Sequence, residues 1–597
     1  MKKLILTACL LLCIGGLLYL LALRSAQPHA DSYQFSLSEQ ILPPAPYPQD
    51  FALQLGQMQG VEIKLRAAAS LPHGICWQQA HGFPEVGSPQ ARKGGTMRLC
   101  NVGPFPANFL AFGSPSPQFF HYNMFNCVEV PLVRAHPDSG ELIPGLAEAW
   151  ALHEGMLWFR LHPQARYSNG RPVRAADFAL GALLRSRSGQ RALADFASCL
   201  HVYGDSVLAV KPRVLGVLPH LSAAAVLHPA EPGFYAEFGS DYTTRYAHRV
   251  PPTTGAYSVC AVQRGRFIAL QRNKNWWAAQ LPGFRYTHNA DVIEHHFLTD
   301  EAQAWEFFLK GKLDLMQTRN IAAWQQYLSS PPQGVRCHRF ELTYPMPPYG
   351  IALNARTIPD VNIRRGLLFS LDMQAAMQLI FRGEAQRLPQ FAVGYRHLPT
   401  TAPVYEYNPQ AARAAFAAAG FSLVGADGFL RNQQGHKLSV RLTFSPSLKV
   451  STLVQTLARR AAACGVEIVA EPLPWQSCAR QVREQSHDML FWATVAGHPL
   501  PDYRRCFHSD ARGDDAPFCL NSKEVDAAII AVEEAASLPE LAAASARLEQ
   551  LIYEQAVWLP AWMENCVNVA VHSRVHLPQQ GYGTYDVADS HTYWLSD

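Results

Sequence analysis

The sequence predicts an α/β fold with several domains, and three observations point to it. The chain has 597 residues, more than one hydrophobic core organises, so about three or four domains of ordinary size are expected. Alternate residues are apolar over 157–162, turn chemistry follows at Ser168-Asn169-Gly170, and 175–184 then has the pattern of an apolar helix. A strand, a helix and a second strand are also predicted over 437–472, so strands and helices alternate along the chain.

Further elements are predicted on the N-terminal side of the chain. Apolar residues at helical spacing predict a helix over 142–150, where Pro144 suits the first turn because no N–H is needed there. A short helix is expected over 51–65 and strands at 202–210. A glycine turn that leads into 96–102 predicts a strand at that position.

The composition is that of a globular protein without a nucleic-acid partner. Hydrophobic residues make up 48% of the chain and charged residues 16%, which excludes a largely disordered chain. The 51 basic and 47 acidic side chains nearly balance, and there is no long Lys/Arg run. A phosphate-binding surface for DNA or RNA is therefore not expected.

The N-terminus predicts export. Met1-Lys2-Lys3 precedes an apolar run over 4–23, which is long enough to cross a bilayer and is led by positive charge. We interpret it as an uncleaved signal anchor that holds a periplasmic protein to the inner membrane. The alternatives are a cleaved signal peptide, which leaves a soluble periplasmic protein, and a lipoprotein modified at Cys9.

Sequence signals for catalysis are sparse. There is no CxxC pair and no Cys/His cluster at zinc spacing, so neither a metal nor another cofactor is predicted. No nucleotide-binding loop or hydrolase motif is present. Cys506 and His508 are close in sequence, but no third group is evident to orient a nucleophile–base pair. The protein is therefore predicted to bind rather than to catalyse.

Several motifs in sequence order resemble one family. PGLAEAW (144–150), ARYSNGRPV (165–173) and AADF (175–178) are similar to the signature of the extracellular solute-binding proteins of ABC transporters, the dipeptide/oligopeptide-binding class or family 5. KGGT (93–96) resembles the opening strand of that family, and HGFPE (81–85) resembles its YejA-like branch. The resemblance implies a two-lobed periplasmic-binding-protein fold of class II, the large peptide-binding type with an extra domain.

The resemblance runs over about 81–597 and has departures. Arg174 stands where the family usually has a threonine that caps the following helix, and Ala256 stands where it has proline. The domain plan that it implies is a membrane anchor or signal segment at 1–24, a linker and N-terminal extension at 25–80, domain I at 81–133, 251–340 and 558–597, domain II at 134–250, and domain III at 341–557.

The ligand site is expected in 487–509, where an apolar strand enters a Gly/Pro loop. In the family, an acidic residue of this segment can hold the α-amino group of a peptide, but Val495-Ala496-Gly497 occupies its place here, and Asp502 is a possible substitute. An ordinary surface loop, or aromatic core packing, is the competing interpretation. The candidate ligand-binding residues are Trp492, Thr494, His498, Asp502, Arg505, Tyr349, Phe119 and Tyr122.

The function implied by the resemblance is capture of peptides or peptide-like solutes outside the cytoplasmic membrane. The expected partners are the permease and ATPase subunits of an ABC importer, and the binding protein is expected to be a monomer. One alternative is a membrane-anchored receptor that uses the same fold without transport. A cell-envelope peptide hydrolase, acting through Cys506 and His508, is the remaining alternative.

Overall fold

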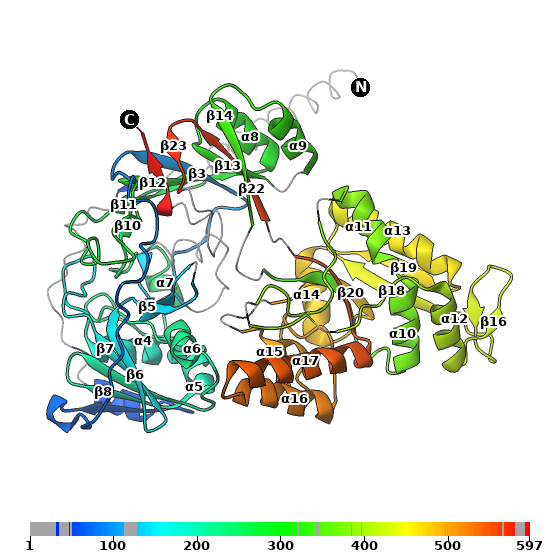
Figure 1. The fold of residues 1–597 in the computed structure, drawn as a ribbon, viewed down its shortest axis with the longest axis horizontal. Helices are drawn as coiled ribbons and strands as arrows, with labels where there is room; N and C mark the ends of the chain where they lie inside the picture. The colour runs from blue at the N-terminus through cyan, green and yellow to red at the C-terminus, as the bar shows by residue number, and fades with distance from the viewer. Residues whose placement is uncertain are drawn as a thin grey trace, which may run out of the picture.

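Two α/β bodies lie side by side, and the chain crosses between them twice (Figure 1). It leaves the first body after β14 (Val335–Glu341) for β15 (Tyr349–Leu353), and it returns from β21 (Trp558–Trp562) to β22 (Cys566–His572). The computed structural model describes residues 32–34, 47, 50–112, 128–137, 139–318, 321–341, 346–383, 385–395, 397–400, 402–495, 497, 500–563, 566–578 and 591–596.

A five-stranded sheet in the order β1-β10-β11-β12-β3 belongs to the first body. The strand predicted at 96–102 is confirmed as β3, which runs parallel to β12 with Thr96 opposite Val292. The sheet thus joins strands that lie far apart in the sequence: β1 (Ser32–Gln34), β3 (Thr96–Val102), β10 (Tyr257–Gln263), β11 (Phe267–Arg272) and β12 (Val292–Leu298).

A second five-stranded sheet of this body has the order β2-β8-β9-β7-β6. The strand predicted over 157–162 is confirmed as β7 (Met156–Leu161). The helix predicted over 142–150 is wrong: the segment forms β5 (Leu142–Pro144) and β6 (Ala147–His153). A register shift in the β6–β7 pairing, between Ala147 and Ala149, interrupts the alternation of apolar residues along the strand. The apolar residues therefore fall at a spacing that also fits a helix.

Another expectation in this body is corrected. The predicted helix over 51–65 ends early: α2 is Phe51–Gly56, and β2 (Glu62–Arg66) then pairs in parallel with β8. The strands predicted at 202–210 are confirmed as an antiparallel hairpin, β8 (Ala197–Tyr203) and β9 (Val207–Pro212). The strand β2 was missed because it pairs with residues distant in sequence, which local patterns do not report.

Helix α4 (Ala175–Arg187) confirms the helix predicted over 175–184 and shows how the chain compensates for Arg174. The backbone N–H of Arg174 donates to the Asp177 carboxylate at 2.9 Å. The Asp177 carboxylate at the third helical position thus accepts the N–H of the N-cap residue, and its negative charge suits the positive end of the helix dipole.

The rest of the first body consists of short elements and a three-stranded sheet in the order β13-β22-β14. These elements are the 3₁₀ helix Ala68–Ser70, β4 (Val133–Ala135), α5 (Ala192–Phe196), α6 (Pro219–Val226), α7 (Tyr242–Arg245), α8 (Glu301–Leu309), β13 (Leu315–Thr318), α9 (Ile321–Ser329), β23 (Val575–His576) and β24 (Trp594–Leu595).

The second body is built on the sheet β19-β18-β20-β15-β21. The strand–helix–strand order predicted over 437–472 is confirmed by β18, α13 and β19. Its elements are α10 (Val361–Ser370), α11 (Met373–Phe381), α12 (Pro409–Ala418), β16 (Leu423–Val424), β17 (Leu430–Arg431), β18 (Ser439–Phe444), α13 (Leu448–Ala463), β19 (Glu467–Pro472), α14 (Trp475–Glu484), β20 (Met489–Ala493), α15 (Tyr503–Phe507), α16 (Lys523–Glu534) and α17 (Leu538–Gln555).

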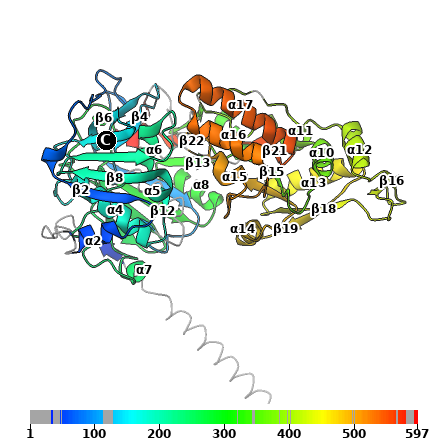
Figure 2. The same cartoon turned by 90° about the horizontal axis from the view of Figure 1, so that it is seen from below.

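Helices α16 and α17 lie on the side of the second body nearest the first body (Figure 2). Val217, in the segment after β9 of the first body, packs against the core that these helices share with Tyr503 and Phe518. The bodies therefore touch at a point distant in sequence from both chain crossings.

The predicted N-terminal anchor at 1–24 lies outside the described residues. Within the described part of the chain, no helix is long and apolar enough to cross a membrane.

Candidate functional site

The predicted ligand segment 487–509 runs from strand β20 into helix α15. Strand β20 lies between β18 and β15, so it is an inner strand of the second body. Strand β15 begins at Tyr349, directly after the crossing from the first body, and β21 ends at Trp562, directly before the return. The sheet thus brings the ends of both crossings next to the predicted segment.

An aromatic group occupies this end of the sheet. The ring of the half-buried Tyr349 stacks on Trp562 at a centroid distance of 5.4 Å and lies 6.2 Å from Phe491. Phe381 of α11 packs edge-on against Trp562 at 4.8 Å. Sequence reasoning missed Trp562 as a site residue because its neighbour Tyr349 is more than 200 positions away, and only the β15–β21 pairing brings them together.

Trp492 and Thr494 lie apart from this aromatic group. Trp492 follows Phe491, so it faces the other side of the sheet, where it stacks on Trp475 at 6.0 Å. Its indole N–H donates to the backbone oxygen of Asp514 at 3.2 Å. Thr494 is buried, and its hydroxyl donates to the Pro348 carbonyl at 3.3 Å. The structure therefore does not gather these two residues with Tyr349.

Asp502 is engaged within its own segment. It caps α15 by accepting the backbone N–H of Arg505 at 3.1 Å, and the Arg505 guanidinium lies 3.7 Å from its carboxylate. Arg505 also pairs with Asp515. Burial raises the pKa of Asp502, and the negative charges of Asp515 and Glu533 act in the same direction while Arg505 opposes them. Asp502 thus already has a cationic partner in the protein, which it shares with Asp515.

The loop over 388–395, which sequence reasoning did not select, braces the candidate segment. The Tyr395 hydroxyl donates to the Gly497 carbonyl at 2.9 Å. The buried Glu549 carboxylate of α17 accepts the backbone N–H groups of Phe391 at 3.1 Å and Ala392 at 2.8 Å. The same carboxylate accepts the Tyr503 hydroxyl at 2.8 Å, and burial raises its pKa. One side chain therefore ties the loop to the start of α15.

The remaining predicted residues are distributed as follows. Phe119, Tyr122 and His498 lie outside the described residues. Cys506 is buried, and desolvation raises the pKa of its thiol, with the Asp502 and Asp515 charges acting in the same direction. A thiol of this kind stays protonated at neutral pH, which disfavours the nucleophilic role considered for it.

The described residues offer no alternative chemistry based on metals or disulfides. No group of three His, Cys, Asp or Glu among them is arranged to hold a metal ion. The cysteines in the described part of the chain, Cys566 aside, are free thiols. The arrangement that remains is a mostly buried aromatic group, of which Tyr349 is the half-buried member, beside a braced loop; the Tyr349 ring and the polar groups of the loop can contact a solute.

Comparison with known proteins establishes the family. Residues 141–514, more than half of the chain, match the model of bacterial extracellular solute-binding proteins, family 5. The chain belongs to this family, which confirms the resemblance seen in the motifs at 144–178. The family comprises binding proteins, as the sparse catalytic signals predicted.

Two relatives agree with the YejA-like branch. The chain is 23% identical to the peptidoglycan-binding protein YepA of Agrobacterium fabrum over 372 residues, 54% of this chain and 57% of YepA. It is 24% identical to the uncharacterized protein YejA of Escherichia coli over 245 residues, 40% of this chain and 39% of YejA. The chain spans about half the length of the curated relatives that it matches.

Solved structures confirm the two-lobed class II fold. The oligopeptide-binding protein AppA from Bacillus subtilis, solved with a nonapeptide, has a TM-score of 0.69 at 15% identity and covers 85% of this chain and 100% of its own. NikA from Brucella suis, solved with Fe(III)-EDTA, has a TM-score of 0.68 at 17% identity and covers 84% of this chain and 100% of its own. At these identities the likeness concerns the fold.

Proposed function

We propose that this protein is the solute-binding component of an ABC importer, and that it captures peptides or peptide-like solutes in the periplasm and delivers them to a permease. Membership of the family over 141–514 is the observation that carries the proposal. The two bodies, joined by two crossings, are the arrangement expected of lobes that close on a ligand around a hinge. Domains I and II form one lobe in this proposal and domain III the other, with the boundaries given above.

The proposed ligand surface is formed by Tyr349 and the braced segment around Asp502. The half-buried Tyr349 ring offers an apolar face that accepts many side chains, and the buried Trp562, on which it stacks, supports it from the core. Asp502 is occupied by Arg505, so it does not hold an ammonium group unless Arg505 moves away. We therefore expect the protein to favour peptides whose amino end needs no carboxylate partner.

Peptides derived from the cell wall are the ligand class to test first. In peptidoglycan, the amino end of the stem peptide is an amide and carries no charge. The relative YepA is named as a peptidoglycan-binding protein. No acidic residue stands at 495–497 of this chain, which agrees with a ligand whose amino end carries no charge.

The test is thermal unfolding of the purified protein with and without peptide. A ligand at about 100 times its Kd adds roughly 2.7 kcal/mol to the free energy of unfolding, which is a clear rise in Tm. We expect this rise with peptidoglycan stem peptides that carry an amide at the amino end, and a smaller rise with the same peptides bearing a free amine.

The variant for this test is Tyr349→Ala, and its matched control is Tyr407→Ala, which removes another half-buried tyrosine of the same body. Loss of the ligand-induced rise in Y349A alone supports the proposed surface. A folded protein whose Tm does not respond to any peptide would overturn peptide capture.

A further inference from the structure

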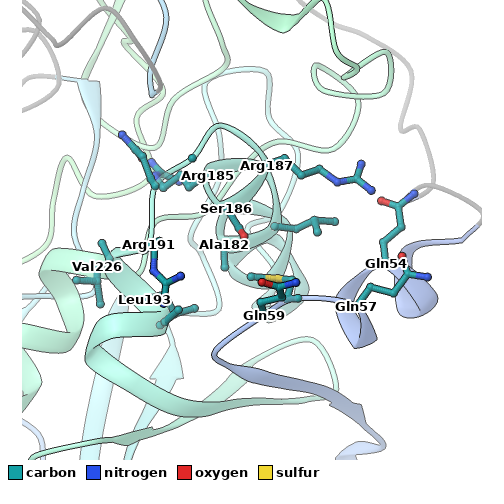
Figure 3. Close-up of a pocket in the computed structure, with 16 residues that line it drawn as sticks. Gln54, Gln57, Gln59, Ala182, Arg185, Ser186, Arg187, Arg191, Leu193 and Val226 are labelled. Carbon is teal, nitrogen blue, oxygen red and sulfur yellow. The ribbon is translucent and has the colours of Figure 1, made fainter.

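A hollow of about 410 Å³ lies on the first body, between α2, the C-terminal end of α4 and α5 (Figure 3). Its lining contains no residue of the second body and none of the candidate ligand-binding residues. The volume is within the range of about 300–1,000 Å³ that is typical of small-molecule sites. The hollow is therefore separate from the proposed peptide site and large enough for an organic ligand.

The lining of this hollow is cationic and rich in amides. Among the described residues that form it are three arginines and no aspartate or glutamate. Side-chain amides from α2, from the segment after it and from the end of α4 add further donors: Gln54, Gln57, Gln59 and Gln190. Such a set of donors, in a lining that itself contains no carboxylate, favours an anion that carries several oxygen atoms.

The three arginines are not equivalent. Arg185 lies 5.1 Å from the Phe112 ring, and burial lowers the pKa of its guanidinium. Arg191 has an exposed ion pair with Asp195 at 3.4 Å, which holds it weakly. Arg187 is exposed and has no ion-pair partner within the part of the chain that the structure describes. Arg187 is therefore the cation that is available to a ligand.

An arginine lies at each end of the hollow, and the two ends differ in what surrounds it. Gln54 and Gln57 lie beside Arg187 at one end (Figure 3). Leu193 and Val226 lie near Arg191, which is paired with Asp195, at the other end. A ligand that fits both ends carries its charge at the Arg187 end and an organic group at the other.

We propose that this hollow binds an organic phosphate, with the phosphate at Arg187, Gln54 and Gln57 and the organic part towards Leu193 and Val226. The planar guanidinium presents paired N–H groups that match two phosphate oxygens, and the two amides can serve the third. Inorganic phosphate alone would leave most of the 410 Å³ unfilled.

The same chemistry is offered by a soluble organophosphate and by the headgroup of an anionic phospholipid. Titration calorimetry of the full chain distinguishes them with two probes: glycerol 3-phosphate, and dihexanoyl phosphatidylglycerol below its critical micelle concentration. Similar affinity for both probes identifies a site for soluble phosphates. Affinity at least tenfold higher for the lipid identifies a lipid headgroup site.

The variant is Arg187→Gln, and the matched control is Arg480→Gln, which removes another exposed helical arginine from α14. We expect R187Q to weaken binding of the preferred probe at least tenfold and to leave Tm unchanged, while R480Q binds like the wild type. Because Arg187 is exposed, we expect R187Q to keep the fold. A wild-type response of R187Q to peptide in the Tm assay is an independent check that the variant is folded.

Three results would overturn the proposal. They are absence of binding for both phosphate probes, glycerol binding as tightly as glycerol 3-phosphate, and equal affinity of R187Q and the wild type. None of them bears on peptide capture, which depends on residues of the second body.

Discussion

In the first body, the Asp177 carboxylate is fully buried and accepts hydrogen bonds from Tyr47 at 2.5 Å, Tyr167 at 3.1 Å and Arg171 at 3.0 and 3.1 Å. In the second body, the Arg505 side chain is 56% exposed and shares its charge between Asp502 and Asp515 at the surface. Both regions pair arginine with aspartate, and they differ in how much water surrounds the pair.

The difference in burial gives the Asp177 cluster a structural role and leaves the Arg505 ion pairs able to exchange partners. A buried carboxylate with this many donors cannot exchange partners without leaving a charge unsolvated, so it fixes the N-terminal extension, through Tyr47, to the turn before α4. An exposed pair contributes little to stability and can be replaced by a ligand group at small cost. The candidate ligand segment therefore belongs to the part of the molecule whose charges can rearrange.

Asp177→Ala tests the buried side of this comparison and should have the largest effect. The substitution leaves the Arg171 guanidinium, only 13% exposed, without its main partner, so we expect a loss of about 3–5 kcal/mol in the free energy of unfolding. Urea unfolding measures it, and Asp195→Ala, which breaks an exposed pair, is the control. If both variants lost less than about 1 kcal/mol, burial would not be what distinguishes the two regions.

His295 tests whether burial also controls titration in the first body. It is 8% exposed in β12, and desolvation lowers its pKa to about 4. Because the unfolded chain has the higher pKa, about 6.5, it binds the proton more readily, so stability is present above that value and is lost as the pH falls towards 4.

This loss amounts to about 3 kcal/mol at pH 4. We expect His295→Gln to flatten the acid side of the stability curve. Stability curves between pH 4 and pH 8 provide the measurement. Identical slopes in H295Q and the wild type would contradict the assignment.

Glu549→Ala tests a buried carboxylate of the second body, whose hydrogen-bond donors are two backbone N–H groups and a tyrosine hydroxyl in place of an arginine. Its removal leaves two backbone N–H groups and the Tyr503 hydroxyl without their acceptor, for an expected loss of about 2–3 kcal/mol. Ligand binding should weaken as well, since the loop over 388–395 loses its attachment. The exposed Glu534→Ala on α16 is the control, and a neutral result for E549A would show that the loop is held by other contacts.

Arg505→Ala should have the smallest effect on folding. Its ion pairs are exposed, so the free energy of unfolding is expected to change by less than about 1 kcal/mol. The Asp502 carboxylate then becomes available, and peptides with a free amino terminus should gain affinity relative to amide-blocked peptides. Calorimetry with the two peptide forms measures this, and an unchanged preference would indicate that Asp502 does not face the ligand.

The elements that the sequence predicted correctly are those whose signals are local. The turn at Ser168-Asn169-Gly170, helix α4 and the order β18–α13–β19 follow from turn chemistry and apolar periodicity within a short window. The family was recognisable for the same reason, because its motifs at 144–178 are contiguous. The segments that were misassigned, at 51–65 and 142–150, owe their conformation to strands elsewhere in the sheet.

The candidate site shows the same division. Its segment, 487–509, was predicted from the motif resemblance, and Tyr349 was among the candidate residues. Trp562 and the bracing residues Tyr395 and Glu549 have no local signal, because they meet the segment only through long-range pairing and packing.

The α/β class, the family resemblance and the predicted ligand segment 487–509 all follow from residues that are neighbours along the chain. Which side chains face one another follows from three-dimensional packing: Trp492 packs away from Tyr349, and Asp502 is already paired with Arg505. The physical reason is that burial and charge pairing depend on all the segments that surround a residue, and sheet pairing brings those segments together from distant parts of the chain.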